Sequence, residues 1–154
     1  MNCLELFAGT GSIGKVLNSC GHNVISLDLK GADINTNILD WDYTTFPKNY
    51  FDYIHASPPC DTFSLCRRCW IGRKLKAHGD TIITKDILDN DEKTIGLPIL
   101  NKTLEIIKYF NPMYFTIENP QTGNMKKYID LPYTDVDYCM YGLPYKKRTR
   151  IWNN

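Results

Sequence analysis

The sequence predicts a doubly wound α/β domain built on a mostly parallel sheet. Short apolar segments of strand length alternate along the chain with segments whose apolar residues recur at helical spacing. Glycines, acids or prolines stand where the expected strands end, and domains of this class bind their ligands at the carboxyl ends of the strands. The chain of 154 residues has the size of one domain, so we expect residues 1–154 to fold as a single unit.

The first half of the chain contains the elements from which this prediction starts. Residues 2–7 form a short apolar segment that runs directly into a glycine-bearing turn at 8–12. Helical spacing follows, and Gly21 stands where that helix would stop. The prolines of Ser57-Pro58-Pro59-Cys60 end a later strand, because proline cannot continue a hydrogen-bonded ladder. The expected order is a strand at 2–7, a helix at 12–20, a strand at 22–28, a loop to 38–42 and a strand at 51–56.

The second half begins with residues 61–92, which are polar, basic and weakly periodic. We expect them to form a long mobile loop. Helical spacing returns afterwards and is broken by Asn111-Pro112. The remaining expected elements are a helix at 95–109, a strand at 113–117 and a final strand pair at 134–139 and 148–152 around the turn 142–144.

The composition, with 43% hydrophobic and 23% charged residues, is that of an ordinary globular protein and excludes a disordered chain. No run approaches the roughly 20 apolar residues of a membrane span, and no secretory leader is present, so we expect a cytoplasmic protein. In that setting the six cysteines are expected to be reduced thiols. Cys66-x-x-Cys69 resembles half of a zinc site, but no second pair completes the four ligands, and we predict no metal.

The net charge of +1 hides a strong asymmetry. Residues 1–64 carry three basic and seven acidic side chains, whereas residues 65–85 carry six basic side chains and one acid. A second basic run occupies 146–150. Two local clusters of cations indicate contact with a polyanion, although a solvated charged face is the alternative that composition alone favours.

A cofactor site is indicated at the first strand end, where Gly9 and Gly11 let the backbone approach a ligand closely. Asp28 ends the next strand, about 20 residues further on, in the position of a ribose-binding acid. Asp40 is a candidate acceptor for an adenine amino group. Because Gly14 completes a G-x-G-x-x-G pattern, a dinucleotide remains open at this point.

Three further segments stand at strand ends: Cys60 after two prolines, Glu118-Asn119-Pro120, and Arg148-Thr149-Arg150. Together with the leading Leu4-to-Gly11 segment, their order and spacing resemble the cytosine-5 DNA methyltransferase family from residue 3 to residue 152. The resemblance implies a seven-stranded Rossmann-like sheet, S-adenosylmethionine as the cofactor, and methylation of carbon-5 of a cytosine flipped out of double-stranded DNA.

The resemblance also implies roles for individual residues. Cys60 is the nucleophile that adds to carbon-6 of the ring, and Glu118, with Asn119 beside it, is the acid at ring nitrogen 3. Arg150 would hold the ring carbonyl, while Arg148 supports the fold or the DNA backbone. The implied cofactor residues are Phe7, Ala8, Gly9, Thr10, Gly11, Ser12, Asp28, Leu29, Asp40 and Pro59. The implied DNA contacts are Ser64, Arg67, Arg68, Arg73 and Lys74, with Trp70 or Ile71 filling the emptied stack.

The sequence departs from the family pattern in several places. Asp61 stands where glutamine is usual, Pro120 replaces valine, and the segment before Arg148 is one residue longer and lacks a glutamine. We expect no separate target recognition domain, so a protein partner or second subunit would supply sequence reading. Three alternatives stay open: an amino-methyltransferase, a catalytically silent cofactor- or DNA-binding module, and methylation of RNA.

Overall fold

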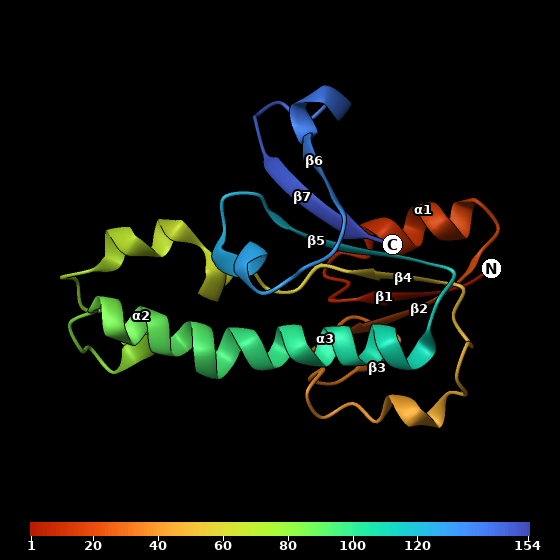
Figure 1. Cartoon of the computed structure of the whole chain (residues 1–154), viewed down its shortest axis with the longest axis horizontal. Helices are drawn as coiled ribbons and strands as arrows, with labels where there is room; N and C mark the ends of the chain where they lie inside the picture. The colour runs from red at the N-terminus through yellow and green to blue at the C-terminus, as the bar shows by residue number, and fades with distance from the viewer.

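The computed structural model describes residues 1–154 and contains one seven-stranded sheet in the order β3-β2-β1-β4-β5-β7-β6 (Figure 1). Strands β1 to β5 are parallel, and β7 runs antiparallel to both β5 and β6. The predicted doubly wound, mostly parallel sheet of seven strands is confirmed. The strands are β1 (Asn2–Leu6), β2 (Asn23–Asp28), β3 (Ile34–Asn35), β4 (Tyr53–Ala56), β5 (Tyr114–Pro120), β6 (Tyr133–Asp137) and β7 (Arg148–Asn153).

Helices lie on both faces of the sheet, with α1 (Ser12–Ser19) on one side and α3 (Leu97–Phe110) on the other (Figure 1). A short helix α2 (Lys85–Asp91) and a π-helical turn (Glu92–Gly96) continue directly into α3. None of the helices is long and apolar enough to cross a membrane.

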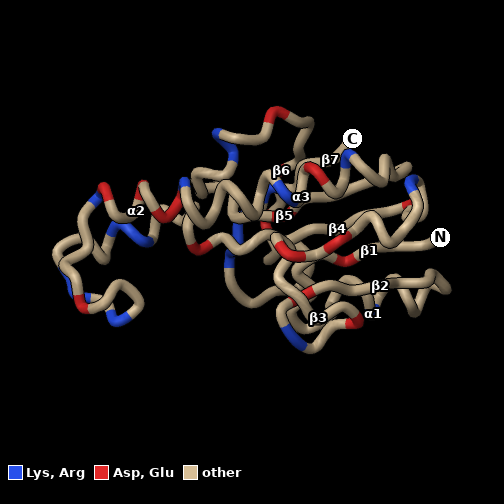
Figure 2. The backbone as a smooth tube through the Cα atoms, turned by 90° about the horizontal axis from the view of Figure 1, so that it is seen from below, with Lys and Arg blue, Asp and Glu red and all other residues tan.

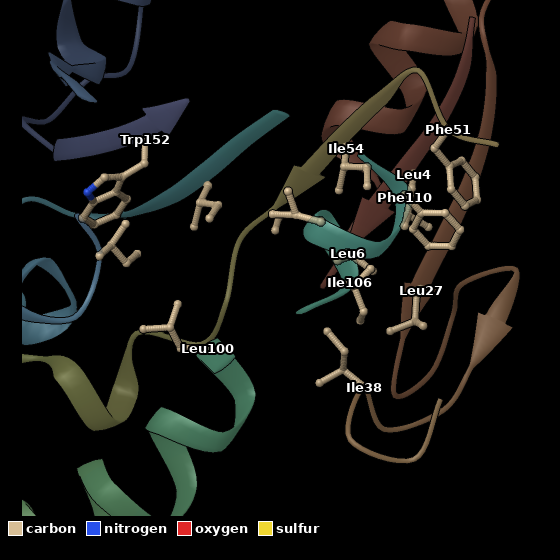
Figure 3. Close-up of a cluster of buried hydrophobic side chains, with 14 of the residues drawn as sticks. Leu4, Leu6, Leu27, Ile38, Phe51, Ile54, Leu100, Ile106, Phe110 and Trp152 are labelled. Atoms are coloured by element: carbon tan, nitrogen blue, oxygen red, sulfur yellow. The ribbon is translucent and has the colours of Figure 1, made fainter. Parts of the chain in front are cut away.

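The main hydrophobic core lies between the central strands and α3 (Figure 3). Leu4 and Leu6 of β1 are fully buried, and so are Ile106 and Phe110 of α3. Burying a large apolar side chain contributes about 1.5–3 kcal/mol. The central strands are therefore fixed firmly enough to hold the loops at their carboxyl ends.

The expected loop at 61–92 is wrong in its second part, because residues 85–92 are helical. Thr84 begins α2 by accepting a hydrogen bond at Oγ1 from the Ile87 amide at 3.3 Å, and Leu88 is buried beneath it. This cap and a single turn of apolar contact are too short to produce visible periodicity. The earlier part holds three 3₁₀ turns, at Asp61–Phe63, Leu65–Trp70 and Lys76–His78.

Candidate active site

The turn after β1 is held open by residues with positive φ angles, Phe7 at 61°, Gly9 at 55° and Gly11 at 68°. Asp28, at the end of β2, ties this turn to its own strand. Its carboxylate accepts from the Gly9 amide at 2.8 Å and from the Leu29 amide at 2.6 Å. The two neighbouring strand ends therefore form one rigid edge.

A cavity of about 170 Å³ opens beside this edge. Its walls are apolar apart from one acid and two small polar side chains. The lining residues are Phe7, Leu27, Asp28, Leu29, Thr36, Asn37, Ile38, Pro59 and Ile99. Four residues that were predicted for the cofactor, Phe7, Asp28, Leu29 and Pro59, meet here.

Asp40 was expected at this cavity, but the structure places it outside. The Asn37 side chain accepts from the Leu39 amide at 3.0 Å, and the Asp40 amide bonds back to the Asn37 carbonyl at 2.9 Å. This tight turn leaves Asp40 exposed and brings Asn37 and Ile38 to the cavity. Asn37 was not predicted from the sequence, since an acid is the commoner acceptor.

Gly14 is explained by a carboxylate rather than by a dinucleotide. Glu5 of β1 is 3% exposed and accepts from the Ile13 and Gly14 amides at 3.2 and 3.0 Å. A Cβ at Gly14 would lie 2.5 Å from a Glu5 oxygen. Because Glu5 already occupies the amides at the start of α1, a pyrophosphate there would meet a negative charge instead of free donors. This arrangement disfavours the dinucleotide alternative.

The remaining predicted cofactor residues of the first turn do not line this cavity. The Ala8 amide bonds the Leu27 carbonyl at 3.1 Å, which fixes the start of the turn. Thr10 and Ser12 are exposed and share a 2.9 Å hydrogen bond between their hydroxyls. Their backbone, with that of Gly11, stays open to a ligand.

The loop that carries Cys60 is tied to the strand ends on both of its sides. Ser57 donates its hydroxyl to the Phe7 carbonyl at 3.1 Å. Asn119, which is 1% exposed, donates its side-chain amide to the Pro58 carbonyl at 2.8 Å. Asn119 was predicted as part of the catalytic group, and its contact makes it the residue that positions the Cys60 loop.

Cys60 is half-buried, and burial raises the pKa of its thiol. The neighbouring Asp61 carboxylate and the charge of Glu118 raise that pKa further, whereas Lys147 lowers it. These influences place the predicted nucleophile and the predicted acid within electrostatic reach of each other. In the free protein the thiol is therefore mainly protonated at neutral pH.

Glu118 stands at the end of β5 with its side chain 14% exposed. One oxygen, Oε1, accepts from the Tyr138 hydroxyl at 3.4 Å and from the Lys147 ammonium at 3.3 Å. Nearby on β4, burial lowers the pKa of His55, whose Nδ1 lies 2.9 Å from the Thr116 hydroxyl. None of these three residues, Tyr138, Lys147 and His55, was predicted from the sequence to belong to the site.

Arg150 does not reach the acid. It makes a bidentate pair with Asp135 at 2.7 and 2.8 Å, and its guanidinium lies 3.6 Å from the centroid of the Tyr133 ring. In the β5–β7 register Arg150 is opposite Asn119, whereas Glu118 is opposite Ile151. Opposed residues share a face of the sheet, so Arg150 and Glu118 point to opposite faces.

Arg148 likewise lies outside the immediate site. It is exposed, and its nearest acid is Asp137 at 3.8 Å. Its side chain does not contact Glu118.

The basic segment divides into one buried cation and several exposed ones. Arg67 is 7% exposed and pairs with Asp91, which also contacts Nε2 of His78 at 2.9 Å. The predicted phosphate contact for Arg67 is thus replaced by an internal ion pair. Arg68, Arg73 and Lys74 are exposed, and the segment carrying them projects beyond the sheet (Figure 2).

Three other residues of this segment were singled out from the sequence. Ser64 accepts from the Cys66 amide at 3.2 Å and lines a cavity of about 250 Å³ together with Arg68. Ile71 is 45% exposed, whereas Trp70 packs near the Arg67 guanidinium at 5.5 Å. Cys66 and Cys69 are free and exposed, and no group of three or more potential ligands is arranged to hold a metal.

The sheet order and the glycine turn define the class of fold, the Rossmann-like fold of methyltransferases. The chain is 43% identical over 158 residues to the "Probable DNA (cytosine-5)-methyltransferase" of Frog virus 3 (isolate Goorha), covering 100% of this chain and 71% of the relative. The chain therefore belongs to the cytosine-5 DNA methyltransferase family. No family model matches the sequence.

Two solved structures show the same fold. The S. pombe Dnmt2 methyltransferase superposes with a TM-score of 0.62 at 16% identity over 99% of this chain. The Entamoeba histolytica methyltransferase EhMeth gives a TM-score of 0.62 at 14% identity over 98%. This chain spans 50% and 52% of those two proteins.

Proposed function

We propose that the chain transfers a methyl group from S-adenosylmethionine to carbon-5 of cytosine in DNA through a covalent adduct at Cys60. One observation carries the proposal. A thiol and a carboxylate project from adjacent strand ends that are joined by the hydrogen bond from Asn119 to Pro58, next to an apolar cavity containing one acid. The relative in Frog virus 3 supports the same assignment.

The cofactor fits the residues present. Phe7, Leu29 and Ile38 offer apolar walls for a purine, and Asp28 has lone pairs left for ribose hydroxyls after accepting two backbone amides. The positive φ angles at Gly9 and Gly11 let the backbone approach the rest of the molecule. When bound, S-adenosylmethionine supplies an electrophilic methyl group.

The reaction begins with addition of the Cys60 thiolate to carbon-6. The sulfur lone pair forms the S–C6 bond, the C5=C6 π pair becomes a C4=C5 bond, and the C4=N3 pair moves to nitrogen 3. Glu118 gives its proton to that nitrogen and becomes a carboxylate. Carbon-5 is then nucleophilic, and its C4=C5 pair would form the bond to the methyl carbon. The methyl–sulfur pair would stay on the donor as a neutral thioether, and the nitrogen-3 lone pair would re-form C4=N3.

The adduct then breaks down to the product. A base removes the proton from carbon-5, the pair from that C–H bond re-forms C5=C6, and sulfur leaves carbon-6 as a thiolate. Proton return from nitrogen 3 to Glu118 restores the starting state. General acid–base steps of this kind contribute about 10²–10⁴-fold each.

Exposed cations would bind the nucleic acid. Arg68, Arg73 and Lys74 are all exposed on the segment after the nucleophile, and Ile71, between them in sequence, is an exposed apolar side chain. Neutralising phosphates makes binding salt-dependent, and an apolar side chain is suited to fill the gap left by a flipped base. Sequence reading by a partner or second subunit belongs to the same proposal.

A trapping experiment tests the function. The protein is incubated with a radiolabelled methyl donor and a mixed-sequence duplex in which every cytosine is 5-fluorocytosine, because fluorine at carbon-5 prevents the final proton loss. A stable protein–DNA adduct is expected with wild type and with Cys66→Ser, and none with Cys60→Ser.

The other outcomes identify the alternatives. Donor binding without an adduct on DNA or RNA would support a catalytically silent module. An adduct on RNA alone would make RNA the substrate in place of DNA. Methyl transfer that survives Cys60→Ser would indicate nitrogen chemistry. Each of these results contradicts the proposal.

A further inference from the structure

The turn between β6 and β7 places one cation directly at the active-site acid. The Lys147 ammonium lies 3.3 Å from Glu118 Oε1 and 4.8 Å from the centroid of the Tyr138 ring. The Tyr138 amide also donates to the Lys147 carbonyl at 3.1 Å. The ammonium therefore lies between a carboxylate and an aromatic ring, and the backbone hydrogen bond between Tyr138 and Lys147 keeps the two residues together.

The arginines that follow are engaged elsewhere. Arg150 has both of its contacts to Asp135 and stacks on Tyr133, with its side chain 12% exposed. A bidentate arginine–carboxylate pair is among the stronger hydrogen-bonded arrangements in proteins. Moving Arg150 to the acid would require breaking that pair and carrying the side chain to the other face of the sheet.

Lys147 has donors to spare for a substrate. An ammonium carries three protons, and one is directed at Glu118 Oε1. The hydrogen bonds from Tyr138 and Lys147 to Glu118 both fall on Oε1, which leaves Oε2 for the ring nitrogen of a cytosine. The lysine side chain is 41% exposed and therefore accessible to a base that enters the site.

We propose that Lys147, rather than Arg150, is the catalytic cation of this site: it orients Glu118 and donates a hydrogen bond to the ring carbonyl of the cytosine. This inference rests on the proposed function. In the addition step Glu118 loses its proton to nitrogen 3, and the Lys147 ammonium compensates the carboxylate charge that appears.

The same charge acts on the nucleophile before the addition. Burial, Asp61 and Glu118 all raise the pKa of Cys60, and Lys147 is the cation that lowers it. Lys147 therefore favours the thiolate before bond formation and the carboxylate after it. A single cation between two groups that become anionic in turn is suited to electrostatic catalysis.

Four variants test the inference: Lys147→Met, Lys147→Arg, the neighbouring Lys146→Met as the matched control, and Arg150→Met. Cofactor affinity, measured by calorimetry, checks that each protein is folded. The first readout is the single-turnover rate of adduct formation on 5-fluorocytosine DNA at saturating DNA. Lys147→Met should lower this rate about 10²–10³-fold, the usual effect of losing one such donor.

The controls separate catalysis from folding and from DNA affinity. Lys147→Arg should restore the rate to within about tenfold of wild type, since it keeps charge and donors. Lys146→Met should change only the DNA concentration needed for saturation. A rate lost in Arg150→Met but kept in Lys147→Met, with cofactor binding intact in both, would overturn the inference.

The second readout needs neither DNA nor cofactor. The pH profile of Cys60 alkylation by iodoacetamide, followed by mass spectrometry, should shift to higher pH in Lys147→Met and stay unchanged in Lys146→Met. A profile that does not move in Lys147→Met contradicts the inference, whatever the adduct assay shows. If wild type forms no adduct while this shift occurs, the proposed function fails and the charge coupling stands.

Discussion

Replacing Arg67 by methionine should destabilise the fold rather than weaken DNA binding selectively. The Arg67 and Asp91 side chains are 9% and 12% exposed, so the substitution leaves a carboxylate with little water around it. Removing one partner of a buried ion pair costs about 3–5 kcal/mol. His78 stays 2.9 Å from Asp91 and remains a partner, so we expect the lower end of that range, about 3 kcal/mol.

Thermal unfolding measures this loss directly. For a domain of this size each kcal/mol lowers Tm by about 2–4 °C, so the expected fall is roughly 6–12 °C. Arg68→Met is the matched control, because its side chain is exposed and surface changes usually stay within about 0.5 kcal/mol. DNA binding measured at several salt concentrations should be affected by Arg68→Met and not by Arg67→Met. In Arg68→Met the slope of log K against log salt should be reduced by about one.

A double variant sharpens the assignment. Arg67→Met with Asp91→Leu removes both charges, and apolar replacement of a buried pair is often neutral, so the double variant should be more stable than Arg67→Met alone. Arg67→Met that melts within about 1 °C of wild type while losing one unit of salt slope would refute the reasoning. In that case Arg67 would be a surface cation, as its sequence neighbours first suggested.

Three further predictions concern the site. Asp61→Gln should lower the pKa of Cys60 and speed its alkylation near pH 8, because the substitution removes a carboxylate that raises that pKa. The assay needs a Cys66→Ser background, since Cys60 and Cys66 fall in one tryptic peptide. An unchanged alkylation rate would count against the charge effect. Asn119→Ala should lower the adduct rate by at least about tenfold with little change in cofactor affinity, because the Pro58 carbonyl loses its donor; an unaltered rate would remove its positioning role. Burial lowers the pKa of His55, so the unfolded chain binds a proton there at a higher pH than the folded protein does. The wild-type protein should therefore lose stability as the pH falls below about 6.5, and His55→Gln should lose less. Denaturant unfolding at pH 5 to 7 measures this difference, and identical pH profiles would contradict it.

The sheet and the position of the Cys60 loop were predictable because their signals are local. Strand-length apolar segments, a glycine turn and two prolines fix φ angles and burial within a few residues of themselves. Phe7, Asp28 and Pro59 accordingly meet at one cavity, as expected for carboxyl ends of parallel strands. Helix α2 gave no comparable signal, since one buried leucine and a threonine cap make no repeating pattern.

Partners distant in sequence were not predictable. Arg67 lies in a run of cations, and nothing nearby reveals that Asp91, 24 residues later, will enclose it. The identity of the cation at Glu118 depends on the register of β7 against β5, and a shift of one residue exchanges the two faces of a strand. The segment before Arg148 is one residue longer than the family pattern, and no local rule says whether that residue is absorbed in the turn or in the strand.

Lys147 and Asp61 have opposite electrostatic effects on one thiol. Asp61 adds a negative charge next to Cys60, where glutamine would add none, and so raises the pKa of the thiol. Lys147, brought to the site by the turn before β7, lowers it. The charge of Glu118 raises the same pKa, so the lysine offsets an effect that lasts only while Glu118 is ionised. When Glu118 takes up the proton that it later gives to ring nitrogen 3, that charge disappears and the pKa of Cys60 falls. Protonation of the acid and formation of the thiolate are therefore coupled.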